Sequence, residues 1–326
     1  MSITFKHTVI HVLDQSIGMP LLSTDLLILN DETESFITRH LIKVFESTSS
    51  CEAIFKADAP LPSMLEGPLT EEVFMHLTSE ITNTFYRYMV EYENIPNGDL
   101  VFTSFIMDGQ NYFGILKLNY KEEYTHFVEQ VDGTVVTRII KNTGIFPGGS
   151  KQVDEGLIIC LDSLHVSLLD NSKGKYLSLM FDLEPALSVK ETVKAIEKVA
   201  SKVIEEHYDN PINAMTELKN NISESIARTQ TIPVQEILEQ TFGEDKDVFD
   251  SCMQHIEEFG IKEAKLEVTD PKIGNKFNFQ KLKTDTGVEV KLPTHLFKDP
   301  DFIEIINEPN GTISIVLKNI SQIINK

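Results

Sequence analysis

The sequence predicts an α+β fold: an antiparallel sheet with helices on one face, followed by a helical module and a small β-rich C-terminal domain. Strand signals follow one another as hairpins in the first part of the chain, and helical periodicity replaces them from about residue 188. Charge changes at similar places. Residues 1–187 carry 12 basic and 26 acidic side chains, residues 188–262 carry 8 and 15, and residues 263–326 carry 9 of each. We therefore expect three domains with these boundaries.

The first domain is expected to begin with one strand and two helices. Residues 3–9 alternate between larger and polar side chains, as in a half-buried strand. Asp31 is a candidate cap for a helix over 32–45, in which apolar residues recur at helical spacing. Thr70, followed by two glutamates, is a second helix start. Its apolar stripe continues toward a stop at 96–98, Pro-Asn-Gly.

Three pairs of strands are expected to follow, at 100–107 with 112–120, 124–131 with 134–140, and 157–169 with 175–183. The first two pairs reverse at Asp108-Gly109 and at Asp132-Gly133, residue types that tolerate positive φ. The third pair is expected to reverse over 170–174. Hairpins in series favour an antiparallel sheet.

The remaining chain is expected to be helical first and then β-rich. Ser188 with Glu191 forms a capping-box pattern for a helix that continues to His207. Further helices are expected after Pro211, after Pro233 and over 244–259. Strand patterns return at 288–292 and 312–317, the second after a Pro-Asn-Gly turn.

Composition limits the class of protein. The longest apolar runs are far shorter than the roughly 20 residues that span a bilayer, and no signal-peptide pattern opens the chain. We expect a cytoplasmic protein without a membrane partner. Cys51, Cys160 and Cys252 are too far apart to suggest a disulfide framework or a cysteine-rich zinc site. The formal charge of −21 repels phosphate, so contact with nucleic acid would need a local exception.

Two histidines form a weak candidate for a metal site. His7 and His11 are four residues apart on the expected first strand, so both side chains face the same side. No third ligand lies nearby in the sequence, and solvated histidines are the more common explanation. We therefore expect no metal and no cofactor.

Asp270, Glu289 and Lys291 follow the order of acidic and basic residues in restriction-type nucleases. There the carboxylates hold magnesium and the lysine helps to activate water, and Glu289 and Lys291 would share one strand face. A half-exposed strand gives the same Glu-x-Lys pattern when its alternate residues face the core. The second interpretation is favoured, so no catalytic residue is assigned and the protein is not expected to be an enzyme.

A local exception to the acidic charge lies in the same region. Between residues 271 and 292 there are five lysines against two acids, a net charge of +3; the lysines are Lys272, Lys276, Lys281, Lys283 and Lys291. Phe277 and Phe279 are interleaved with them, as on surfaces where lysines hold phosphates and rings meet bases. The alternative is that both phenylalanines face the core. These five lysines are the candidate nucleic-acid-binding residues.

The order of features resembles that of the bacterial nucleoid-associated proteins of the NdpA type over nearly the full length. The resemblance is carried by Ile10-His11-Val12-Leu13, Gly98-Asp99-Leu100-Val101, the segment 176–181 and Gly311-Thr312-Ile313-Ser314-Ile315. It implies a cytoplasmic bacterial protein that associates with the nucleoid and binds DNA, with no catalytic residue to carry over.

The sequence and this resemblance together suggest a nucleoid-associated protein that binds double-stranded DNA weakly and with little sequence specificity. The lysine-rich C-terminal segment would make the contact. The first alternative is an acidic interaction scaffold that binds a basic nucleoid protein. The second is a metal-dependent nuclease at the three residues above. A homo-oligomer is compatible with all of these.

Overall fold

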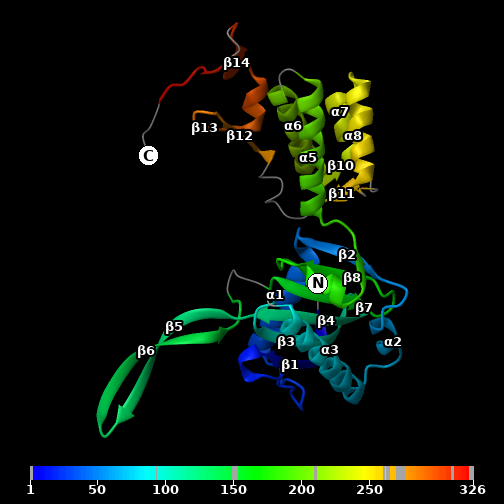
Figure 1. Ribbon diagram of the computed structural model, residues 1–326, viewed down its shortest axis with the longest axis vertical. Helices are drawn as coiled ribbons and strands as arrows, with labels where there is room; N and C mark the ends of the chain where they lie inside the picture. The colour runs from blue at the N-terminus through cyan, green and yellow to red at the C-terminus, as the bar shows by residue number, and fades with distance from the viewer. Residues whose placement is uncertain are drawn as a thin grey trace. The chain divides into compact units, whose positions relative to one another are not determined.

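The computed structural model describes residues 3–92, 94–148, 153–208, 211–259, 261, 265–268, 277–309 and 312–322. The chain divides into two compact units, residues 1–188 and residues 189–326 (Figure 1). Both units contain helices together with antiparallel strands, which confirms the α+β class. A further division of the second unit at residue 262 stays a prediction. None of the helices in these ranges has the length and apolar composition that crossing a membrane requires.

A seven-stranded antiparallel sheet forms the centre of the first unit. In spatial order its strands are β1 (Ile3–Leu13), β3 (Gly98–Met107), β4 (Gln110–Asn119), β7 (Glu155–Cys160), β8 (Val166–Asp170), β2 (Ser50–Phe55) and β9 (Leu183–Pro185). The expected first strand and first hairpin are confirmed. Asp108 and Gly109 form a two-residue turn with φ of 49° and 84°, the positive values that suit the twist of a tight hairpin.

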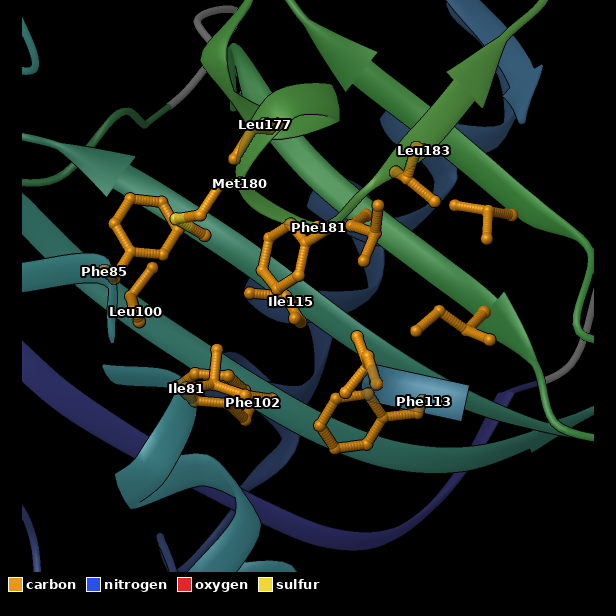
Figure 2. Packing of buried hydrophobic residues seen from close by; sticks show 14 of the residues in the cluster. Ile81, Phe85, Leu100, Phe102, Phe113, Ile115, Leu177, Met180, Phe181 and Leu183 are labelled. Carbon is orange, nitrogen blue, oxygen red and sulfur yellow. The ribbon is translucent and has the colours of Figure 1, made fainter. Parts of the chain in front are cut away.

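Helices cover both faces of this sheet, which corrects the expectation of one face. Apolar residues of α1 (Asp31–Glu46) pack with Val101 and Phe105 of β3. Those of α3 (Glu71–Glu91) pack with the alternate residues of the same strand, Leu100 and Phe102. Figure 2 shows this second layer, where side chains of α3 and α4 (Tyr176–Met180) meet the sheet. Because β3 and β4 are apolar at successive positions, both of their faces must be buried.

Helix α1 begins one residue earlier than expected. The cap is Asn30, whose side chain accepts hydrogen bonds from the backbone N–H groups of Glu32 and Thr33, and Asp31 is the first helical residue. Asp31 still favours the helix through the positive end of its dipole. The cap of α3 is Thr70, as expected.

The expected pairing of 157–169 with 175–183 is wrong. Residues 157–169 contain two strands, β7 and β8, which pair with each other. In the turn between β7 and β8, Leu164 has a φ of 57°, and the Leu164 N–H donates to the carbonyl of Cys160. The segment after the 170–174 loop forms α4 because its N-terminus bonds Asp170: the Leu177 N–H donates to Oδ2 of that carboxylate at 2.9 Å. The short helices α2 (Leu61–Met64) and η1 (Gln15–Ile17) complete the unit.

The hairpin of β5 (Lys121–Val131) and β6 (Thr134–Ile145) does not join the sheet. Among the described residues, the two strands pair only with each other, and they extend away from the rest of the first unit (Figure 1). The Asp132-Gly133 turn has the predicted positive φ values, 49° and 80°. The residue types of the turn therefore account for the hairpin. No local sequence pattern decides whether the hairpin joins the sheet.

The described residues of the second unit form four α-helices and short hairpins. The helices are α5 (Val189–His207), α6 (Pro211–Thr229), α7 (Val234–Phe242) and α8 (Lys246–Glu258), all at the expected places. The strands are β10 (Thr231–Pro233) with β11 (Lys265–Glu267), β12 (Phe279–Lys283) with β13 (Glu289–Pro293), and β14 (Ile303–Asn307) with β15 (Ile313–Leu317); η2 (Thr294–Lys298) follows β13. Val268 and Phe277 belong to the same apolar cluster as the helices.

The two histidines of the candidate metal site face α3. The His7 ring lies 5.5 Å from the ring of Phe74, and His11 bonds Thr78 one turn further on. His11 Nδ1 accepts the backbone N–H of Ser23 at 3.0 Å, so its proton lies on Nε2, which donates to the Thr78 hydroxyl at 3.1 Å. Both ring nitrogens of His11 are thus engaged within the protein.

We expect the stability of the protein to fall between pH 6.5 and pH 4. Burial lowers the pKa of His11 and of His40 from 6.5 to about 4, so the unfolded chain binds more protons than the folded one in this window. For each histidine the loss at pH 5 is about 2 kcal/mol. Urea unfolding at pH 7 and pH 5 measures it, and the difference should be smaller in His11→Gln. An unchanged difference in that variant would contradict the assignment.

A glycine in β7 lets helix α1 approach the sheet closely. A Cβ atom at Gly156 would lie 2.7 Å from Cγ2 of the buried Val44 and 3.3 Å from the carbonyl oxygen of Ile115. We expect Gly156→Ala to reduce the free energy of unfolding by about 1–3 kcal/mol through overpacking. Gly174→Ala is the control, because a Cβ there meets nothing within 4 Å. Equal unfolding midpoints in urea for both variants would be evidence against this packing.

Candidate nucleic-acid interface

The candidate lysines of the described chain lie on the hairpin of β12 and β13. Thr284 and Gly287 close its turn, the N–H of Gly287 donating to the Thr284 carbonyl at 3.0 Å and φ of Gly287 being 87°. Side chains alternate strictly along β12. Gln280 is buried and Leu282 half-buried, whereas Phe279, Lys281 and Lys283 are exposed on the opposite face. We call this exposed side of β12 and β13 the basic face.

The cross-strand register brings the lysines of the basic face together. Lys281 is directly opposite Lys291, and Lys283 is opposite Glu289. Lys283 Nζ lies 3.7 Å from the Glu289 carboxylate, whereas Lys291 Nζ lies 4.1 Å from the centre of the Phe279 ring. Like charges on directly opposed residues destabilise a hairpin. An anion over Lys281 and Lys291 would therefore relieve repulsion, and Phe279 adds an exposed ring beside them.

The hairpin is attached to the second unit by its inner residues. Phe277, just before β12, is fully buried in the helical core. Gln280 accepts a hydrogen bond from Lys219 of α6 at 3.0 Å, and Ser223 of the same helix donates to Asn278 at 2.8 Å. The Thr294 hydroxyl, just after β13, donates to the Phe277 carbonyl at 2.5 Å. These contacts turn the opposite side of the hairpin outward.

The structure therefore brings together three of the five candidate lysines, Lys281, Lys283 and Lys291. Lys272 and Lys276 lie outside the described residues. The two phenylalanines have different roles: Phe277 is a core residue and Phe279 is 40% exposed. If the alternation of the strand extended back to Phe277, both phenylalanines would lie on the same side of the hairpin. The strand begins only at Phe279, so the alternation does not apply to Phe277. Sequence periodicity alone could not separate them.

The nuclease triad is not assembled within the described chain. Glu289 and Lys291 share a strand face, as predicted, but Asp270 lies outside the described residues. The Glu289 side chain is 74% exposed and paired with Lys283. A carboxylate so open to water is a poor ligand for a catalytic magnesium ion, which needs a shaped and partly dry site. Within the residues the structure describes, no three His, Cys, Asp or Glu side chains are grouped to bind a metal.

A buried polar cluster in the first unit was missed by the sequence analysis. Lys117 Nζ lies 3.7 Å from Glu155 and donates to the carbonyl of Pro96 at 2.9 Å. Asn119 donates to Glu155 at 2.6 Å, and the Tyr176 hydroxyl donates to the same carboxylate. Burial lowers the pKa of Lys117 to about 8, although Glu155 opposes the shift. The signal in the sequence is a lysine inside the apolar strand of the central hairpin.

This cluster is a structural feature rather than a reaction site. Lys117 and Glu155 are 1% and 2% exposed, so neither can meet a substrate in this conformation. The pKa of Tyr176 is raised by burial and by the adjacent Glu155, which keeps its hydroxyl protonated as a donor. Lys117 is therefore unavailable to an external anion, unlike the lysines of the basic face.

Comparison with known proteins adds a family to these observations. A family profile described as nucleoid-associated protein YejK matches residues 9–324. No match was found among curated proteins. The profile match includes the sheet of the first unit except the start of β1, the helices of the second unit and the basic face, and it extends over far more than half of the chain. The chain therefore belongs to the family of the nucleoid-associated protein YejK.

Proposed function

We propose that this protein binds nucleoid DNA directly through the basic face, weakly and with little sequence specificity. The observation that carries the proposal is the opposed pair Lys281 and Lys291 beside the exposed Phe279. Family membership supports a place at the nucleoid. Lys283 belongs to the same surface, and Lys272 and Lys276, which lie outside the described residues, are proposed as further contacts.

Physical chemistry sets the expected mode of binding. Lysine ammonium groups contact phosphates as point charges, and phosphate contacts carry no base information. The Phe279 ring can pack on a sugar or an exposed base, which is also tolerant of sequence. The exposed side chains of the hairpin are mainly lysines and Phe279, without the side-chain amides that read base edges by paired donors and acceptors. Binding should therefore depend on duplex charge rather than on sequence.

The overall charge limits the affinity. A net charge of −21 repels DNA at long range, so only the local potential of the basic face favours the complex. The Lys283–Glu289 pair further reduces the charge available there. Salt screens both the long-range repulsion and the local attraction. Because phosphate binding releases counterions, the net affinity still falls as the salt concentration rises. We expect measurable binding at low salt only.

The combined variant Lys281→Ala, Lys283→Ala and Lys291→Ala tests the proposal. Each phosphate neutralised contributes about −0.9 to the slope of log affinity against log salt, so three lysines contribute about −2.7. We expect the variant to flatten the slope by about 2–3 and to weaken binding to different duplex sequences equally. Fluorescence anisotropy with labelled duplexes across a salt series measures both effects.

The matched control removes three exposed lysines from helices of the same unit, Lys194, Lys202 and Lys246. Its charge change is identical and alanine suits helical positions, so a small and equal decrease in both triple variants would mean only a general charge effect. Equal slopes in the parent and in the basic-face variant would place the contact elsewhere. Absence of binding by the parent at low salt would refute direct contact.

A second candidate function is an acidic scaffold that binds a basic nucleoid protein. It is favoured by the charge of the first 187 residues, 12 basic against 26 acidic side chains. In this case the protein would recover a basic partner from cell extract after the DNA has been digested, and added polyanion would release that partner. Recovery that needs intact DNA would instead favour the basic face. Loss of recovery in the triple variant of the basic face would also favour contact through the basic face.

A further inference from the structure

A cavity of about 420 Å³ opens between the segments of α2, α3 and α4 in the first unit. Its floor is apolar, and the floor residues Leu61, Ile81, Met180 and Phe181 are between 4% and 9% exposed. Figure 2 shows Ile81, Met180 and Phe181 in the layer of side chains that packs on the sheet. Cavities of this size that combine an apolar floor with a few polar groups are typical sites for small molecules.

The rim of the cavity lies along one side of α3. It is lined by Glu80, Asn83, Thr84 and Arg87. These positions are three, four and seven residues from Glu80, so they share one face of the helix. Among the lining residues only Glu80 and Arg87 carry a charge. We call the apolar floor together with this rim the α3 pocket.

Arg87 brings an exposed guanidinium group with spare donors to the α3 pocket. Its Nη2 donates to the Thr84 hydroxyl at 3.0 Å, one turn back along α3, which holds the group at the rim. Within the described residues no carboxylate forms an ion pair with Arg87. A guanidinium has several N–H donors in a planar fork that matches the two oxygens of a carboxylate.

Glu80 limits the charge that the α3 pocket accepts. Its carboxylate lies 3.8 Å from Nε2 of His76, also one turn back along the helix. Residues 80 and 87 are two turns apart and both side chains reach back by one turn, so the two charges are about 10 Å apart. A ligand with several negative charges would be repelled by Glu80, whereas a single carboxylate at Arg87 keeps its distance from it.

We propose that the α3 pocket binds a small amphipathic carboxylate, with its carboxylate on Arg87 and its apolar part on the floor. A volume of 420 Å³ holds about 14 water molecules at about 30 Å³ each, so roughly ten to fourteen non-hydrogen atoms fit. An amine would leave the guanidinium without a partner. A nucleic acid would bring several phosphates to Glu80 and no apolar group to the floor. The site is thus distinct from the basic face.

Phenylbutyrate, an apolar carboxylate of this size, is the probe that tests the site. Met64 and Met180 line the α3 pocket, whereas Met19 is 59% exposed in another segment. In protein labelled at the methionine methyl groups, we expect the NMR signals of Met64 and Met180 to shift and saturate with a Kd of about 1 mM. The Met19 signal should stay in place. Absence of a saturable shift at about 10 mM probe overturns the proposal, as does an equal shift at Met19.

Arg87→Gln tests the role of the guanidinium. We expect phenylbutyrate to bind this variant about tenfold more weakly, because a charge-assisted pair is lost. The neutral amide of the same shape should bind the parent and the variant alike. The matched control is Arg39→Gln on α1, where Arg39 Nε likewise donates one turn back, to the Ser35 carbonyl at 3.3 Å. That control should bind phenylbutyrate as the parent does. Equal affinity of the parent and Arg87→Gln for the probe overturns the proposal.

Two further comparisons separate a carboxylate site from a merely apolar surface. Glu80→Gln removes a like charge about 10 Å from the bound carboxylate, so it should bind phenylbutyrate about twofold more tightly. Phenylbutylamine has the same apolar part and the opposite charge, and it should bind the parent more weakly than phenylbutyrate. These measurements contain no DNA, so their outcome does not depend on the basic face. Equal or tighter binding of the amine would show that Arg87 does not select the ligand and would overturn the proposal.

Discussion

The buried ion pair of Lys117 and Glu155 fixes how the elements of the first unit meet. The two residues are cross-strand partners, so a shift in the register of β4 against β7 would leave two charges unpaired in the interior. Removing such charges from water is costly, and the structure offsets the cost with bonds to Pro96, Asn119 and Tyr176. These partners come from a loop, a strand and α4, so one buried pair holds several segments in place.

Burial on both faces of the central sheet explains why the first unit has two helical layers. Successive residues of β3 and β4 are buried, and the apolar stripes of α1 and α3 cover opposite sides. The β5–β6 arm lies outside this arrangement. Its pleat and turn match those of the central hairpin, but its side chains remain in water. The first unit therefore buries its own core and leaves apolar side chains of the arm exposed.

The proposed function depends on a local departure from average composition. The chain is strongly acidic, but one hairpin of the second unit places lysines opposite each other around an exposed ring. The arm is the corresponding exception in polarity, an apolar row on an acidic unit. The basic face is held outward by the packing behind it, where Phe277 is part of the helical core.

The sequence by itself determined the elements that depend on neighbours along the chain. Asp108-Gly109 and Asp132-Gly133 specified tight turns, and Thr70 specified a helix start, because backbone conformation and capping are local. It also indicated the family and a lysine-rich segment. Only the tertiary structure decided which hairpin joined the sheet, which of Phe277 and Phe279 was buried, and that Lys117 was an interior residue. These outcomes depend on competition for buried area and on the pairing of distant polar groups, which no local pattern records.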